Sequence, residues 1–175
     1  FRLTLNNTSA SNIIIPSGDW EIVLNGKNQL DGKGKYCSGI ALYITDGGTA
    51  TIVAGTGAAS LTANGYKTSG NVDGSCGIEV QGNLTVKSGN VVAVMEATGQ
   101  FNDASGAIYV TQKGTLNING GSVTAKGKGK YGLCALGTVN MSDGNFEITG
   151  ENKVAVDHGQ NSNFTLSGGT VIITS

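Results

Sequence analysis

The chain has 175 residues, of which 29 are glycine and 1 is proline, and only 13% are charged. This length suits one domain with a sizeable core, and a composition rich in Gly, Thr, Ser and Asn predicts many short strands joined by tight corners, with almost no helix. The net charge of −1 argues against a nucleic-acid partner, because there is no basic surplus to neutralise phosphates. No apolar run approaches the length that crosses a bilayer, so membrane insertion is not expected.

The first 19 residues are the least regular part of the chain. Leu3 and Leu5 alternate with polar residues, and Ile13–Ile15 followed by Pro16 indicates an edge strand. We expect residues 1–19 to form an irregular first coil and repeats to run from about 20 to 175, all within one domain. An end coil exposes strand edges that tend to pair with other chains, so we also expect flanking coils or domains of a longer protein.

From about residue 20 onward, one phrase recurs: a short alternating strand, a corner that contains glycine, and a second alternating strand. The clearest copy is Gly-Thr-Leu-Asn-Ile-Asn-Gly-Gly-Ser-Val-Thr-Ala at residues 114–125. The second apolar residue of each phrase serves as a marker: Leu24, Ile52, Val86, Ile118, Met141 and Leu166. The markers are 28, 34, 32, 23 and 25 residues apart, and spacings of this size are typical of repeat proteins.

A third strand, which usually opens with glycine, completes each repeat, as in residues 39–44, 77–80 and 106–110. If each strand pairs with its equivalent in the next repeat, the result is an all-β fold. We predict a right-handed parallel β-helix, or solenoid, with three short strands per coil and about six coils. An antiparallel sandwich is the rival fold, but it needs hairpin turns, which fit one loop of variable length per repeat less well.

The alternation also predicts which face of each strand points inward. The expected inward residues are Leu24, Ile52, Leu61, Ile78, Val80, Leu84, Val86, Val92, Val94, Ile108, Val110, Leu116, Ile118, Val123, Cys134, Leu136, Val139, Met141, Phe146, Ile148, Val154, Val156, Phe164, Leu166, Val171 and Ile173. The outward positions of the first strand form a polar column of Thr51, Thr85, Asn117, Asn140 and Thr165. A regular threonine array would favour ice binding, but asparagine interrupts this one and Lys87 follows it, so a solvated polar face accounts for it.

The loop between the second and third strands takes up the differences in repeat length, and loops on a rigid scaffold commonly carry function. Each of its four copies holds one aromatic residue, and three hold lysines beside it. Rings pack against sugar faces, and lysine meets uronate carboxylates as a point charge. The candidate carbohydrate-binding residues are therefore Tyr36, Tyr66, Phe101, Tyr131, Lys33, Lys35, Lys67, Lys128 and Lys130. The alternative is that the rings fold back over the backbone of their own loops.

The same loops carry acidic residues. Asp31, Asp73 and Asp103 are the candidate calcium ligands, because calcium takes several oxygen ligands, including backbone carbonyls. No calcium-loop spacing of a known type accompanies them. The alternative is that these acids form turns by capping their own backbone.

Three cysteines are present. Cys37 and Cys76 precede equivalent glycines in successive coils, offset by one position, and stacked strands lie about 4.8 Å apart, so a disulfide between the two is within reach. Cys134 is expected to be a small core residue.

Phrases such as Leu116-Asn-Ile-Asn-Gly-Gly-Ser-Val-Thr-Ala, followed by a Gly-rich loop and a short Gly-Ile-like strand, resemble a family of bacterial secreted and surface β-helix proteins. That family is described as carbohydrate-binding domain-containing and is distantly similar to the pectate-type polysaccharide lyases. The resemblance covers about Trp20 to Ser175, and its motifs are structural. It implies an extracellular or bacterial cell-surface protein in contact with glycan, with calcium as the one cofactor it suggests.

We predict a non-catalytic extracellular protein that binds polysaccharide through the aromatic and lysine loops, with a polysaccharide or cell-surface glycan as partner. A structural or adhesive stalk segment that makes protein contacts is the alternative. A fragment of a calcium-dependent lyase is the third reading, but its candidate lysines lie on glycine-flanked loops with no sign of the burial that lowers a lysine pKa. The only histidine, His158, should lie on the opposite face of its strand from Asp157, which argues against a Ser-His-Asp triad.

Overall fold

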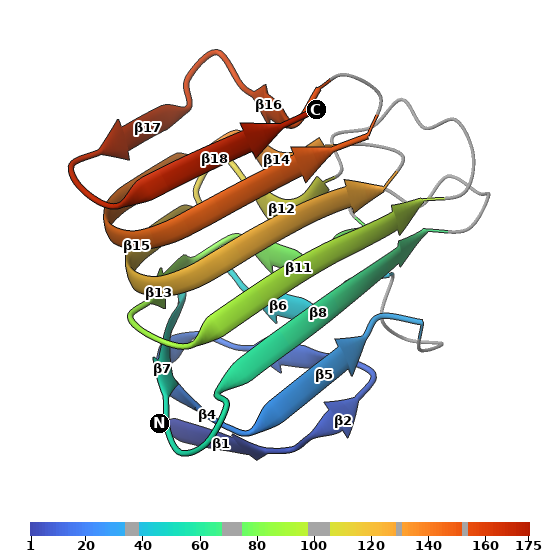
Figure 1. Ribbon diagram of the computed structural model, residues 1–175, viewed down its shortest axis with the longest axis vertical. Coiled ribbons are helices and arrows are strands. Elements are labelled where there is room, and N and C mark those ends of the chain that lie inside the picture. Colours follow the sequence, from blue (N-terminus) through green and yellow to red (C-terminus); the bar gives the residue numbers. More distant parts are fainter. Residues whose placement is uncertain (34–38, 68–74, 98–105, 129–130, 152–153) are drawn as a thin grey trace.

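The computed structural model describes residues 1–33, 39–67, 75–97, 106–128, 131–151 and 154–175. The regular elements in these ranges are all strands, and every ladder between them is parallel (Figure 1). No helix occurs in these ranges, and so none that is long and apolar enough to span a membrane. The fold is therefore all-β, and the rival antiparallel sandwich is wrong.

Sheet A curls into a parallel half-barrel with two limbs. The first limb contains β1 (Arg2–Asn6), β4 (Gly18–Asn25), β7 (Gly48–Ala54), β10 (Asn83–Val86), the first halves of β13 (Thr115–Lys128) and β15 (Thr138–Gly150), and β17 (Asn163–Leu166). The second limb contains β2 (Ser9–Ala10), β5 (Lys27–Asp31), β8 (Ser60–Lys67), β11 (Asn90–Ala97), the second halves of β13 and β15, and β18 (Thr170–Thr174).

Sheet B has six strands: β3 (Ile13–Ile15), β6 (Leu42–Ile44), β9 (Ile78–Val80), β12 (Gly106–Val110), β14 (Tyr131–Ala135) and β16 (Val156–His158). The chain passes through the first limb, the second limb and sheet B in turn, and each strand pairs with the equivalent strand of the next pass. Residues 1–15 take part, because β1, β2 and β3 pair with β4, β5 and β6.

The corner between the two limbs uses a left-handed backbone in every pass. The corner residues with positive φ are Asn7, Gly26, Gly57, Gly89, Gly121, Gly144 and Gly169. Glycine adopts this conformation at little steric cost, and asparagine is among the few other residues that tolerate it. At Gly121, a Cβ atom would also lie 2.6 Å from the carbonyl oxygen of Gly89, so this corner leaves no room for a side chain.

Aliphatic side chains from both limbs and from sheet B fill one core. Most of the predicted inward residues between Leu24 and Ile148 belong to it. The predicted polar column is also confirmed, because the ladders align Thr51, Thr85, Asn117, Asn140 and Thr165 on the outer face. Within this column Asn140 Nδ2 donates to Asn117 Oδ1 at 3.0 Å.

Four predicted inward positions as far as Ile148 are wrong in phase, and beyond it the predicted inward residue Val154 is 45% exposed whereas its neighbour Ala155 belongs to the core. Val92 and Val94 lie on the outer face of β11, because Val91, Ala93 and Met95 supply the core. An uninterrupted apolar run has no alternation that shows its inward face, and in the structure Ala93 pairs with the core residues Ala63 and Ala125 on either side.

The other two wrong positions lie in sheet B and after it. Cys134 is buried, but it aligns with Tyr109 on the face of β14 opposite to Leu133. Leu136 follows β14 and is only half-buried. The marker Leu24 is also two residues out of register, since Ile52 pairs with Ile22.

Candidate functional site

Side chains at the ends of the second-limb strands form one row, the strand-end row, made of Lys33, Tyr66, Glu96, Lys128 and Glu151. The ladders pair Tyr66 with Glu96 and Glu96 with Lys128. Lys33 follows β5, and the amide of Glu151 donates to the carbonyl oxygen of Gly127 at 3.0 Å, so these two extend the row. The row therefore presents a cation, a ring, an anion, a cation and an anion in succession.

The lysines of the strand-end row are paired within the row. Nζ of Lys33 lies 4.4 Å from the centroid of the Tyr66 ring, a cation–π contact worth roughly 0.5–1 kcal/mol at an exposed site. Nζ of Lys128 lies 3.2 Å from Oε1 of Glu96, and the two side chains are 57% and 44% exposed. Because such exposed pairs contribute roughly 0–1 kcal/mol, either lysine can exchange its partner for a ligand at little cost.

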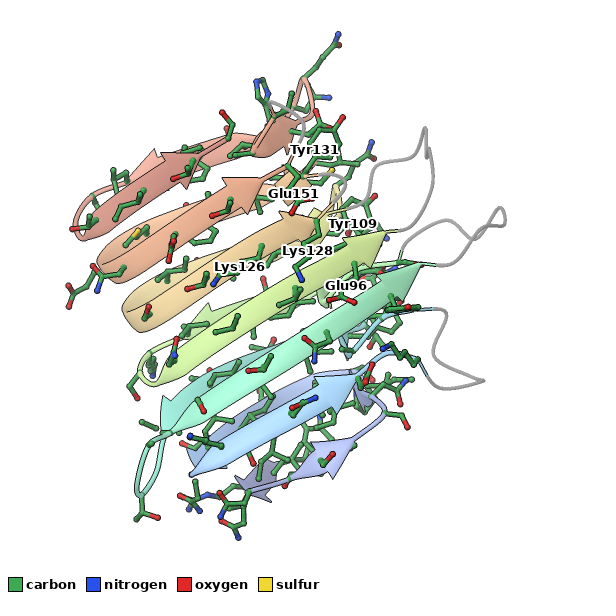
Figure 2. The ribbon with its side chains drawn as sticks, turned by 45° about the vertical axis from the view of Figure 1, so that its right-hand side comes forward. Glu96, Tyr109, Lys126, Lys128, Tyr131 and Glu151 are labelled. Carbon is green, nitrogen blue, oxygen red and sulfur yellow. The ribbon has the colours of Figure 1, made fainter. Side chains whose placement is uncertain are left out.

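Tyr131 opens β14 at the same edge of the molecule as Glu96, Lys128 and Glu151 (Figure 2). Its side chain is half-buried. Burial, followed by the nearby carboxyl of Asp157, raises the pKa of Tyr131. At neutral pH this ring is an uncharged phenol that can pack against a ligand and also offer a hydroxyl.

The structure thus brings Lys33 together with Tyr66 and places Lys128 and Tyr131 along the same edge. Lys67 ends β8, and its side chain is not among those described. The remaining predicted carbohydrate-binding residues lie outside the described residues: Tyr36, Lys35, Phe101 and Lys130.

Of the predicted calcium ligands, only Asp31 lies in a described segment, and Asp73 and Asp103 lie outside. Oδ1 of Asp31 is buried with no hydrogen-bond partner among the described residues. Asp31 lines an open hollow of about 420 Å³ with Ser9, Ser11 and Lys33. These oxygens are fewer than the six to eight that calcium takes, and no metal-binding group of three acidic, His or Cys side chains occurs in the described segments. The described residues therefore do not complete a calcium site.

The predicted disulfide involves one residue that lies outside the described ranges, Cys37. Cys76 is fully buried just before β9, and burial raises the pKa of its thiol.

Sequence reasoning missed a second row, on the outer face of sheet B. The ladders align Tyr43, Glu79 and Tyr109, which we call the tyrosine–glutamate row, and Cys134 and Asp157 continue it. Sγ of Cys134 lies 3.8 Å from Oδ2 of Asp157. Adjacent strands lie about 4.8 Å apart, so the two tyrosines are roughly 10 Å apart with Glu79 between them.

Glu79 is only 6% exposed, and its Oε1 accepts a hydrogen bond from Nε2 of Gln81 at 2.8 Å. Burial raises the pKa of Glu79, and the Gln81 hydrogen bond offsets part of that rise. Burial is also the main cause of the raised pKa of Tyr43 and Tyr109. The row therefore presents two half-buried phenols beside a carboxyl group that is held toward its neutral form.

The sequence carried a signal for this row. In the phrases Leu-Tyr-Ile, Ile-Glu-Val and Ile-Tyr-Val, which end at residues 44, 80 and 110, one large polar residue lies between two core aliphatics. Aligning these phrases places Tyr43, Glu79 and Tyr109 at one position.

His158 belongs to neither row, because it lies on the opposite face of β16 from Asp157. The ladder pairs it with the core residue Ala135 and pairs Asp157 with Cys134, so the two neighbours point to opposite faces as predicted.

No protein-family model, curated protein or solved structure matches this chain. The geometry of the two rows therefore carries the functional argument. They supply rings, hydroxyls and exchangeable charges on adjoining faces, which suits the binding of an extended polar ligand.

Proposed function

We propose that this chain is a segment of right-handed parallel β-helix that binds polysaccharide outside the cell, without catalysis. The uniform parallel pairing of each strand with its equivalent in the next pass supports the β-helix part of this proposal. A bacterial secreted or surface location is part of the same proposal, and it rests on the family resemblance of the repeats.

The observation that carries the binding proposal is the tyrosine–glutamate row. Tyr43 and Tyr109 are half-buried on one face, so their rings are fixed by the sheet and still accessible. Rings held in this way lose little conformational entropy when a sugar packs on them. Glu79 lies between the two tyrosines, and together with its hydrogen-bond partner Gln81 it can hydrogen-bond to sugar hydroxyls.

The strand-end row supplies the charged part of the proposed site. Lys33 and Lys128 are held by weak, exposed contacts, to Tyr66 and Glu96 respectively. A uronate carboxylate can replace the Glu96 partner of Lys128 with little loss, because both pairings are charge-assisted and solvated. Acidic polysaccharides should therefore bind more tightly than neutral ones at low salt.

The test is affinity gel electrophoresis of the wild type and a Tyr43→Ala/Tyr109→Ala variant in gels that contain neutral or uronate-rich polysaccharide. We expect the wild type to be retarded and the double variant to lose about tenfold in affinity, since each ring contact contributes roughly 0.5–1.5 kcal/mol. Absence of retardation of the wild type in every gel would overturn the proposal.

The matched control is Tyr43→Phe/Tyr109→Phe, which keeps both rings and should keep most of the binding. Thermal melting of all variants separates lost binding from lost folding. Parallel gels with calcium and with chelator test whether calcium contributes.

A structural or adhesive stalk segment is the second candidate function. Its supporting observation is a group of exposed aliphatic and aromatic side chains at the C-terminal end of the core, including Phe164, Leu166 and Ile173. If the chain binds no glycan but associates with another protein through this end, the result would favour the stalk function.

A further inference from the structure

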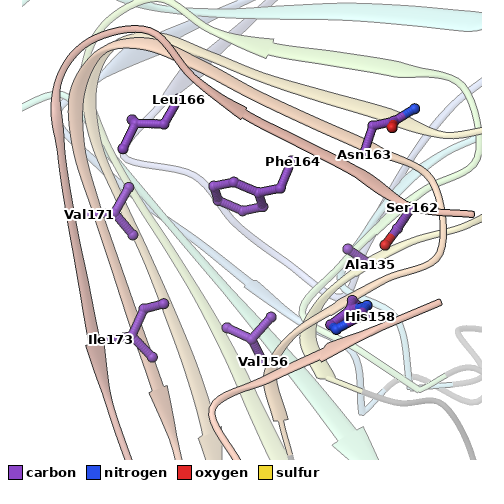
Figure 3. A pocket seen from close by; sticks show the side chains of 9 residues that line it. All are labelled: Ala135, Val156, His158, Ser162, Asn163, Phe164, Leu166, Val171 and Ile173. Atoms are coloured by element: carbon purple, nitrogen blue, oxygen red, sulfur yellow. The ribbon is translucent and has the colours of Figure 1, made fainter. Parts of the chain in front are cut away.

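The C-terminal end of the core is uncovered. Phe164, Leu166 and Ile173 are 48%, 53% and 59% exposed, although alternation directs all three inward. With Val156 and Val171 they surround a hollow of about 460 Å³ (Figure 3). The walls are mainly apolar, so water in this hollow has few hydrogen-bond partners.

The ladders identify what this end lacks. Leu166 pairs with Met141, and Ile173 pairs with Ile148. Met141 and Ile148 are at most 1% exposed, because β17 and β18 lie over them. Leu166 and Ile173 occupy the same inward rows, and no described strand lies over them.

The backbone at this end is also unpaired on one side. Among the described strands, β17 and β18 each pair only with β15, and β16 pairs only with β14 (Figure 1). Their far edges present N–H and C=O groups that can accept another strand. Strand edges and apolar side chains thus lie together around one hollow.

A second copy of the chain fits this surface poorly. In a head-to-tail contact it would offer its N-terminal end, where Leu5 and Ile15 are only 4% and 1% exposed. In a tail-to-tail contact a twofold axis would make the meeting strands antiparallel. Every described ladder continues instead in parallel.

We propose that the C-terminal end is a docking surface for one more β-repeat. This occupant has three short strands that pair in parallel with β16, β17 and β18, and alternate residues of its strands are aliphatic. The docked repeat continues the stack of parallel strands. Its strands pair with the free N–H and C=O groups of the three edge strands, and its aliphatic side chains cover the apolar hollow. The proposal is independent of glycan binding, which uses other faces.

The test supplies such a repeat in cis. A copy of residues 127–150, which contains a sheet B strand and both limb strands, is appended after Ser175 of the full chain. We expect amide hydrogen exchange in β17 and β18 to slow by about tenfold or more, because their edges become paired. The control carries the same appended residues in scrambled order and should exchange at the rate of the original chain.

Circular dichroism of the extended chain shows whether the appended copy has folded, and a second variant tests whether the added protection comes from docking on this end. Leu166→Asp/Ile173→Asp should leave the melting temperature of the original chain nearly unchanged, yet remove the added protection from the extended chain. Equal exchange in the copied and scrambled extensions would overturn the proposal. Slow exchange in the original chain, together with a dimer in analytical ultracentrifugation, would overturn it in favour of a second copy.

Discussion

The two ends of this molecule are built from the same kind of strand but differ in how they finish the core. At the N-terminal end Leu5 and Ile15 are almost fully buried, and at the C-terminal end Leu166 and Ile173 are more than half exposed. All four side chains lie on inward faces of their strands. Inward orientation therefore does not by itself bury a side chain in a repeat protein, because the adjacent repeat supplies the cover.

The N-terminal end is closed by a short first pass of the chain. Leu5 pairs with Leu24, 19 residues later, whereas Met141 pairs with Leu166, 25 residues later. The amide of Thr8 donates to Oδ1 of Asn28 at 2.8 Å and holds this short pass against the next one. Within this pass Leu5 and Ile15 are covered, so the core is closed at this end.

The largest effect should be a difference in unfolding free energy between alanine substitutions of two paired isoleucines. Ile148→Ala removes a fully buried side chain and should cost about 2–5 kcal/mol of unfolding free energy. Ile173→Ala, at the paired position in β18, should cost less than about 1 kcal/mol, because its side chain is already exposed. Urea unfolding followed by circular dichroism measures both, and similar costs would show that the C-terminal end is covered in solution.

The next effect concerns the closed end. Trp20 packs against the core and stacks on Phe1 with ring centroids 4.7 Å apart. Trp20→Ala should cost roughly 2–4 kcal/mol and increase the binding of a dye specific for exposed apolar surface. Trp20→Phe is the matched control and should cost far less, since the indole nitrogen is buried without a hydrogen-bond partner among the described residues. Unchanged dye binding in Trp20→Ala would mean that Trp20 does not close this end.

A smaller effect on stability should appear in the middle of sheet B, where strands lie on both sides of β9. The pKa of Glu79 is raised by burial, so the folded state holds this proton more tightly than the unfolded state. The unfolding free energy should therefore fall as pH rises from the ordinary glutamate pKa through the raised one. Glu79→Gln should lose that part of the pH dependence and be the more stable protein at neutral pH. Chemical unfolding of both proteins across this range gives the difference curve, and a flat curve would contradict the assignment.

The smallest effect is expected at the strand-end row, far from either end of the core. Lys128→Met and Glu96→Gln, alone and together, form a double-mutant cycle whose coupling energy should be below about 0.5 kcal/mol. Urea unfolding at low and high salt measures it. A coupling above 1 kcal/mol would mean that this ion pair is structural, and Lys128 would then be a poor partner for a uronate.

The sequence predicted the parts of the fold that local chemistry determines. Glycine corners and regular alternation predicted strands at β7, β10, β13 and β15. They also predicted the position of the polar column of threonine and asparagine. It failed where local chemistry is ambiguous. The apolar run around Val92 has no alternation, and its phase is fixed by neighbouring strands that one strand's sequence does not reveal.

The candidate site was predicted only in part. Lys33, Tyr66, Lys128 and Tyr131 lie along one edge of the structure, but nothing within a single repeat indicates that Glu96 and Tyr66 contact the lysines. Such pairings join residues about 32 positions apart, so they depend on the register between repeats. The tyrosine–glutamate row was within reach of the sequence, because its members occupy equivalent positions in successive third strands.

The parallel stack also has a mechanical consequence. Its strands run across the long direction of the molecule, so the hydrogen bonds between passes lie along that direction (Figure 1). A pull applied at the two termini would load these ladders one after another instead of shearing them all at once. The last pass, which contains β17 and β18, has the most exposed core side chains, so its strands would separate from β15 first. Stretching of single molecules should then show a series of small length increments that begins at the C-terminus, the behaviour of an extensible tether that yields gradually under load.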